Sequence, residues 1–125
     1  MKFIHTADWH LGKIVHSIYM TENQQYILQR FLQIIEEEKP DAIIIAGDLY
    51  DRSVPPTEAV DLLNAILFKI NIEMNIPVIA ISGNHDSAER LSFASPWLKH
   101  SQLYIQGKLE EEIEPIHING VNFYC

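Results

Sequence analysis

Residues 42–52 read AIIIAGDLYDR, a continuous apolar run that changes abruptly into two carboxylates and a guanidinium. An apolar run without alternation is typical of a strand buried on both faces of a parallel sheet. In such sheets, ligands bind in the crevice beyond the carboxyl ends of the strands, where Asp48 and Asp51 would then lie. The alternative is that Gly47 and Asp48 form an ordinary turn after a strand.

A second polar motif follows the first predicted strand, which covers residues 2–6. Asp8 and His10 are two positions apart. In an extended segment such residues point to the same side, so we expect a carboxylate and an imidazole to converge, as metal ligands do. Gly12 would let the backbone turn away sharply. The alternative is an Asx turn beside an exposed histidine.

A third motif follows the predicted strand at residues 78–82, where the chain reads Gly83-Asn84-His85-Asp86. Asn84 offers a neutral oxygen ligand. His85 can bind a metal, donate a proton or contact a phosphate. Beside the other two motifs, this pattern favours a site over a simple asparagine turn.

The segments between these strands predict helices. A capping-box pattern at residues 21–24 predicts a helix start, and Lys39-Pro40 predicts its end. A second helix is expected over residues 56–75. It is apolar nearly all round, which indicates either burial within the domain or a subunit interface. Short helices over 89–99, a strand at 103–105 and a hairpin turning at Asn119-Gly120 complete the expected α/β fold.

Composition limits the classes of function. The 125 residues, 47% of them hydrophobic, fit one globular domain or part of one. The formal charge of −8 argues against binding of nucleic acid by general electrostatic attraction. It does not exclude a nuclease, because bound divalent cations would offset part of the negative charge of a carboxylate-rich site. No apolar run approaches the ~20 residues of a membrane span, and no signal peptide is recognisable. The single cysteine, Cys125, predicts a reducing, cytoplasmic compartment.

Two right-handed crossovers would place the three strand ends side by side and bring the polar side chains into one crevice. Mixed oxygen and imidazole ligands suit manganese, iron or zinc better than calcium. One carboxylate on the middle strand could bridge two ions, and such a pair clamps a phosphate. The sequence has no phosphate-binding P-loop and no dinucleotide-binding glycine motif.

The three motifs resemble the first three motifs of the calcineurin-like metallophosphoesterases. The longer stretches at 5–13, 47–56 and 83–87 are similar to a branch of DNA nucleases that work with an ATPase subunit in break repair. The resemblance implies a sheet sandwich flanked by helices, of which this chain is the amino-terminal βαβαβ half followed by short helices and a hairpin. It also implies a site with two divalent ions, most commonly manganese.

The resemblance also implies a role for each site residue. Its metal ligands would be Asp8 and His10 on the first ion, Asp48 as the bridge and Asn84 on the second ion. Its catalytic residues would be His85, which stabilises the transition state or protonates the leaving oxygen, Asp51, which orients His85, and Arg52, which contacts phosphate or braces the loop.

The family takes further ligands from later histidines, and His100 and His117 lie in the wrong context to replace them. We therefore expect residues 1–125 to be an amino-terminal fragment with an incomplete site and little or no activity alone. The resemblance implies DNA as substrate, an ATPase partner and a homodimer through helix 56–75 and the region of Phe93 and Trp97. A phosphatase or small phosphodiesterase, and a non-catalytic assembly module, are the alternatives.

Overall fold

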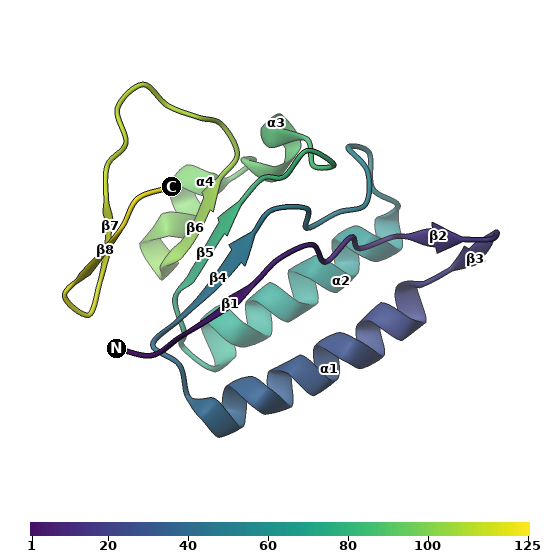
Figure 1. The fold of residues 1–125 in the computed structure, drawn as a ribbon, viewed down its shortest axis with the longest axis horizontal. Coiled ribbons are helices and arrows are strands. Elements are labelled where there is room, and N and C mark those ends of the chain that lie inside the picture. The colour runs from purple at the N-terminus through teal and green to yellow at the C-terminus, as the bar shows by residue number, and fades with distance from the viewer.

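The computed structural model describes all residues, 1–125, and its centre is a four-stranded parallel sheet (Figure 1). The strands lie in the order β1 (Phe3–Thr6), β4 (Ala42–Ala46), β5 (Val78–Ile81) and β6 (Leu103–Gln106). Ile44 of β4 pairs with His5 on one side and with Ile79 on the other. The predicted α/β fold with parallel strands is confirmed, and the three polar motifs follow three neighbouring strands.

Helices cover one face of this sheet. They are α1 (Thr21–Glu38), α2 (Thr57–Phe68), its π-helical continuation η1 (Lys69–Glu73), and the short α3 (Ala88–Leu91), α4 (Ser95–Leu98) and η2 (Lys99–Ser101). Alternate strand residues such as Ile43 and Ile45 point into a 17-residue core, to which α1, α2, η1 and α3 contribute their buried side chains. This core fixes the register of the sheet, because a shift by one residue would turn the buried side chains to the other face.

A β-hairpin packs on the opposite face of the sheet. Its strands β7 (Ile116–Ile118) and β8 (Val121–Phe123) pair as the sequence predicts, and Asn119 and Gly120 have the positive φ angles of a type I′ turn. Ile118 is buried there against Ala42 and Ile79. Within residues 1–125 the hairpin is thus the only layer on this face, opposite the larger helix layer (Figure 1).

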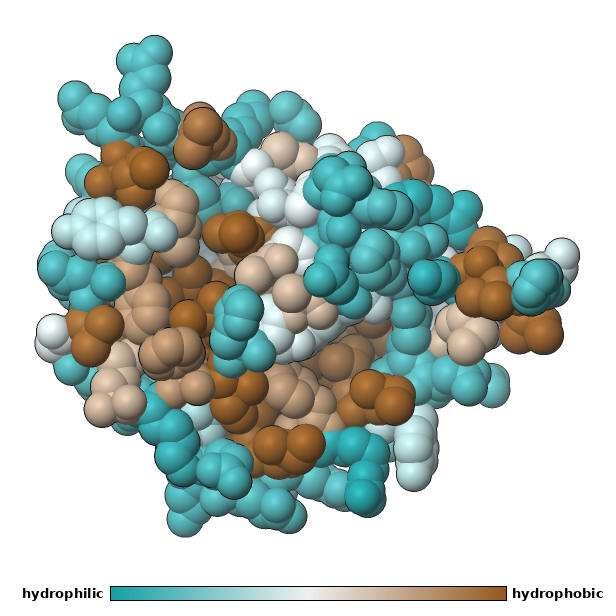
Figure 2. All heavy atoms as spheres, viewed as in Figure 1, coloured by the Kyte–Doolittle hydropathy of each residue, from teal (hydrophilic) through white to brown (hydrophobic).

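A second, smaller hairpin extends from the body between the first strand and α1. Its strands are β2 (Ile14–Val15) and β3 (Ile18–Tyr19), and all four residues are exposed. Figure 2 shows hydrophobic side chains at this end of the molecule, on the right of the view. None of the helices combines the length and the hydrophobicity that a membrane-spanning helix requires.

Two expectations about the helices need correction. The predicted start and end of α1 are confirmed, but the capping-box interaction is absent, because Met20 occupies the N-cap and no side chain caps the helix. Gln24, the last residue of that pattern, bonds instead to the loop after β1. The expected helix 56–75 is slightly shorter, consisting of α2 and η1, and its last turn is π-helical.

Candidate metal centre

The loops that follow β1 and β4 remain joined beyond the ends of the strands. The amide of Asp8 donates to the Gly47 carbonyl at 3.0 Å, and that of His10 donates to the Asp48 carbonyl at 2.9 Å. A further hydrogen bond joins the two loops, from the Asp51 amide to the Leu11 carbonyl at 3.1 Å. The backbone that carries the candidate ligands is therefore held by hydrogen bonds between two loops.

Three of these residues adopt the left-handed backbone conformation. Asp8, His10 and Asp48 have φ angles of 55°, 47° and 49°. The sequence predicted that Asp8 and His10 converge because their segment is extended, and that reason is wrong. The side chains meet because the loop coils in a conformation that costs a non-glycine residue about 1–2 kcal/mol. Strained backbone of this kind clusters at functional sites.

Asp8, His10 and Asp48 form one group of possible ligands. Nε2 of His10 lies 3.7 Å from a carboxylate oxygen of Asp8 and 3.6 Å from one of Asp48. One donor atom from each residue lies within 4.8 Å of the other two. Asp48 is only 6% exposed, so its charge needs a counter-charge or hydrogen bonds. Two carboxylates and an imidazole at these distances fit a divalent cation.

The carboxylate of Asp51 orients His10. It lies 3.1 Å from Nδ1 of His10. Because an ionised carboxylate only accepts hydrogen bonds, Nδ1 is the donor, and Nε2, which lies towards Asp8 and Asp48, is the ring nitrogen left to bind a cation. This arrangement of carboxylate, histidine and metal is common around metal ligands.

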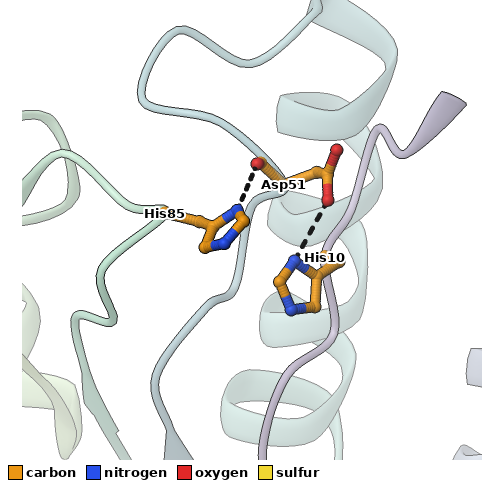
Figure 3. A group of neighbouring side chains, drawn as sticks. All are labelled: His10, Asp51 and His85. Atoms are coloured by element: carbon orange, nitrogen blue, oxygen red, sulfur yellow. Dashed lines mark hydrogen bonds and ion pairs between the residues drawn. The ribbon is translucent and has the colours of Figure 1, made fainter.

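His85 lies across the site from His10, and Figure 3 shows one of the two rings on each side of Asp51. The rings are nearly perpendicular, with centroids 4.8 Å apart. Nδ1 of His85 is 2.9 Å from the backbone carbonyl of Asp51. The family resemblance implied that the Asp51 carboxylate orients His85. In the structure the carbonyl does so, because the carboxylate is turned to His10.

The environment of His85 favours its charged form. The pKa of the imidazole is raised, first by the hydrogen bond to the Asp51 carbonyl and then by the nearby carboxylates of Asp48, Asp51 and Asp86. A carbonyl only accepts, so Nδ1 of His85 also carries a proton. Its Nε2 faces away from that bond and is available to a ligand.

Asp86 and Gly83, to which the sequence assigned no role, allow the β4 and β5 loops to lie in close contact. The Asp86 carboxylate accepts from the amides of Leu49, Tyr50 and Gly83 at 2.8–3.1 Å and so ties the β5 loop to the β4 loop. Burial and the Asp86 charge raise the pKa of Tyr50 to about 12. A Cβ on Gly83 would lie 2.1 Å from the Asp48 carboxylate, so only glycine fits there.

The remaining predicted residues lie at the rim. Asn84 and Arg52 are exposed, and neither side chain makes a hydrogen bond or an ion pair. Asn84 is placed beside Asp48, because the amide of its neighbour His85 donates to the Asp48 carboxylate at 2.9 Å. The roles expected of Asn84 and Arg52 stay predictions.

A comparison with known proteins agrees with this geometry. The sequence profile of the calcineurin-like phosphoesterases matches residues 1–124, and the chain belongs to that family. Its fold is that of a calcineurin-like phosphoesterase, a family that implies divalent metal ions, and Asp8, His10 and Asp48 are possible ligands for one.

One curated relative shows which kind of phosphoesterase this chain is similar to. The chain is 52% identical over 124 residues to SbcD, the D component of the nuclease SbcCD, of Staphylococcus epidermidis. The match covers 99% of this chain and 33% of that protein, so the chain spans about a third of the length of its curated relative.

Proposed function

We propose that this chain carries the first part of the catalytic centre of a metal-dependent DNA nuclease. The observation that supports it best is the convergence of Asp8, Asp48 and Nε2 of His10, with Nδ1 of His10 held by Asp51. The chemistry rests on these loops. DNA as the substrate rests on the resemblance and on the name of the relative.

Each side chain has a role in this proposal. Asp8 and His10 would hold one cation, and Asp48, shared between the two positions, would hold a second together with the Asn84 amide oxygen. When bound, a pair of divalent cations, most commonly manganese in the resembling family, polarises the phosphate and lowers the pKa of the attacking water. His85, with Nδ1 on the Asp51 carbonyl, presents Nε2 to the phosphate and protonates the leaving oxygen. Arg52 contacts the phosphate from the rim.

The proposed activity is exonuclease action on duplex ends and endonuclease action on single strands, in a protein that works with an SbcC-type ATPase in break repair and recombination. The rival within the same family is a phosphatase or small phosphodiesterase. The full-length protein should be assayed with manganese on linear duplex DNA and on an aryl phosphate. We expect DNA cleavage that Asp48→Asn abolishes. Hydrolysis of the aryl ester alone would contradict the nuclease proposal.

We also propose that the outer surface of α2 and the α3–α4 segment pairs with a second copy. Its exposed apolar side chains are Val60, Phe68, Ile72, Phe93 and Trp97, and the last two are 80% and 72% exposed. Leu63 does not belong to this surface, because it is 5% exposed and lies in the core. A partner of another kind on the same surface is the assembly-module alternative.

A double variant tests the pairing. Phe68→Glu with Trp97→Glu should convert the full-length protein to a monomer by light scattering, because charges at a buried interface are strongly unfavourable. Tyr26→Glu is the control, since Tyr26 is 64% exposed but lies on α1. An unchanged mass in the double variant would exclude this surface as the dimer contact.

A cytoplasmic location, which the single cysteine suggested, stays a prediction.

A further inference from the structure

The loop after β1 has a second support besides the β4 loop. The side chain of Gln24, in the first turns of α1, bonds to three backbone groups of this loop. Its amide nitrogen donates to the His10 carbonyl at 2.7 Å and to the Trp9 carbonyl at 3.3 Å. Its oxygen accepts from the Gly12 amide at 3.1 Å. One side chain thus contacts both sides of the turn that carries His10.

These bonds satisfy groups that have few other partners. Gly12 is buried, and Gln24 is the only acceptor for its amide. An unpaired buried amide is costly, so the turn and the glutamine side chain stabilise each other. The three bonds reach backbone groups within residues 9–12. This segment follows the left-handed Asp8 and ends at Gly12, which is also left-handed, with a φ of 85°.

Apolar packing alone does not hold the loop against α1. A cavity of about 480 Å³ lies between them, lined among others by Trp9, Met20, Ile27 and Phe31. Trp9 touches Phe31 edge to face, with ring centroids 5.9 Å apart. A loop beside such a space has room to relax from its left-handed conformation. The Gln24 bonds therefore supply the directional restraint that the packing lacks.

We propose that Gln24 is a positioning residue of the metal centre. It fixes the left-handed turn that brings His10 Nε2 between the carboxylates of Asp8 and Asp48, and it acts through the backbone without touching the cation. This inference rests on the proposed metal binding. It assigns Gln24 a tertiary role in place of the helix-capping role that its sequence pattern predicts.

The test uses the full-length protein with three variants. Gln24→Met keeps the length of the side chain and removes all three hydrogen bonds. Gln24→Glu keeps an acceptor for the Gly12 amide but places an oxygen against the carbonyls of Trp9 and His10. Gln25→Met is the matched control, since Gln25 is the exposed next residue of α1.

Hydrogen–deuterium exchange of the metal-free proteins is the first measurement. In Gln24→Met, the segment 9–13 should exchange faster than in the wild type, while the strand segment 42–46 keeps its protection. An unchanged rate at 9–13 would overturn the proposal. Equal acceleration of both segments would also overturn it, because it would show a general loss of stability.

Manganese titration by calorimetry is the second measurement. Residues that orient metal ligands typically change metal affinity by about 10–100-fold, so both Gln24 variants should bind about 10-fold or more weakly than Gln25→Met. Wild-type affinity in Gln24→Met or Gln24→Glu would overturn the proposal. If the wild type itself bound no manganese, the proposed function would fail, while the exchange measurement would still decide whether Gln24 holds the loop.

Discussion

The two sides of the candidate centre are built differently. On the side of β1 and β4, Asp8, His10 and Asp48 lie on loops that are joined by backbone hydrogen bonds and supported by Gln24. On the side of β5, Asn84 and His85 are exposed and project from one short loop. In the proposed centre, the first cation would therefore be held by the better-supported β1 and β4 side. The proposed phosphate contact of His85 would lie on the open β5 side.

The largest expected effect comes from the contact between the two sides. Gly83→Ala would place a Cβ 2.1 Å from the Asp48 carboxylate and 2.4 Å from the Asp48 amide nitrogen. Relief of this overlap must move the β4 loop, and we expect the free energy of unfolding in urea to fall by about 3 kcal/mol.

Gly120→Ala is the matched control for this prediction. Gly120 also has a positive φ, of 78°, but a Cβ there meets no atom within 4 Å. Only the conformational cost of about 1–2 kcal/mol applies to it. Equal stability of the two variants would show that the β4 and β5 loops are not in the tight contact described.

A smaller effect is expected on the β1 and β4 side. Asp51→Ala removes the acceptor of His10 Nδ1 and frees the ring to rotate or change tautomer. Manganese affinity should fall by about 10-fold, as is typical for loss of such a partner. Asp51→Asn, whose amide oxygen still accepts, should lose less. Wild-type affinity in Asp51→Ala would contradict the role given to this carboxylate.

The smallest effect concerns protonation on the β5 side. In the metal-free protein, nuclear magnetic resonance should show His85 titrating with a pKa above 6.5, because the Asp51 carbonyl and three carboxylates favour the imidazolium. A pKa raised on folding means that its contribution to stability is present below the unfolded value and is lost as pH rises through the folded value. Asp48→Asn should lower this pKa. A value at or below 6.5 in the wild type would contradict the arrangement around the ring.

The architecture was predictable because it follows from short-range patterns. Ile43 to Ile45 belong to an apolar run that is typical of a doubly covered strand, and β4 lies between two parallel neighbours in the sheet. The Asn119-Gly120 pair and the alternation around it fixed the register of the second hairpin. From the resulting strand order, the meeting of the three polar loops follows.

The details of the site depend on tertiary contacts that no local pattern encodes. Gln24 fits a capping box in the sequence, but in the structure its side-chain amide bonds to three backbone groups of the loop after β1 instead of capping the helix. Asp51 was assigned to His85 by resemblance, and only the folded structure shows its carboxylate on His10. Asp86 belongs to the third sequence motif, but its three amide donors come from two loops, which the motif does not reveal.

We expect the cation to be held from the β1 and β4 side, while the β5 histidine serves the phosphate. Manganese titration by calorimetry on Asp48→Asn and His85→Ala is the decisive test of this division. Asp48→Asn keeps an oxygen for the His85 amide but loses the buried charge, so its affinity should fall by more than the about 10–100-fold typical of supporting residues. His85→Ala should bind manganese nearly as the wild type does. Loss of binding in His85→Ala together with wild-type affinity in Asp48→Asn would show that the two roles are reversed.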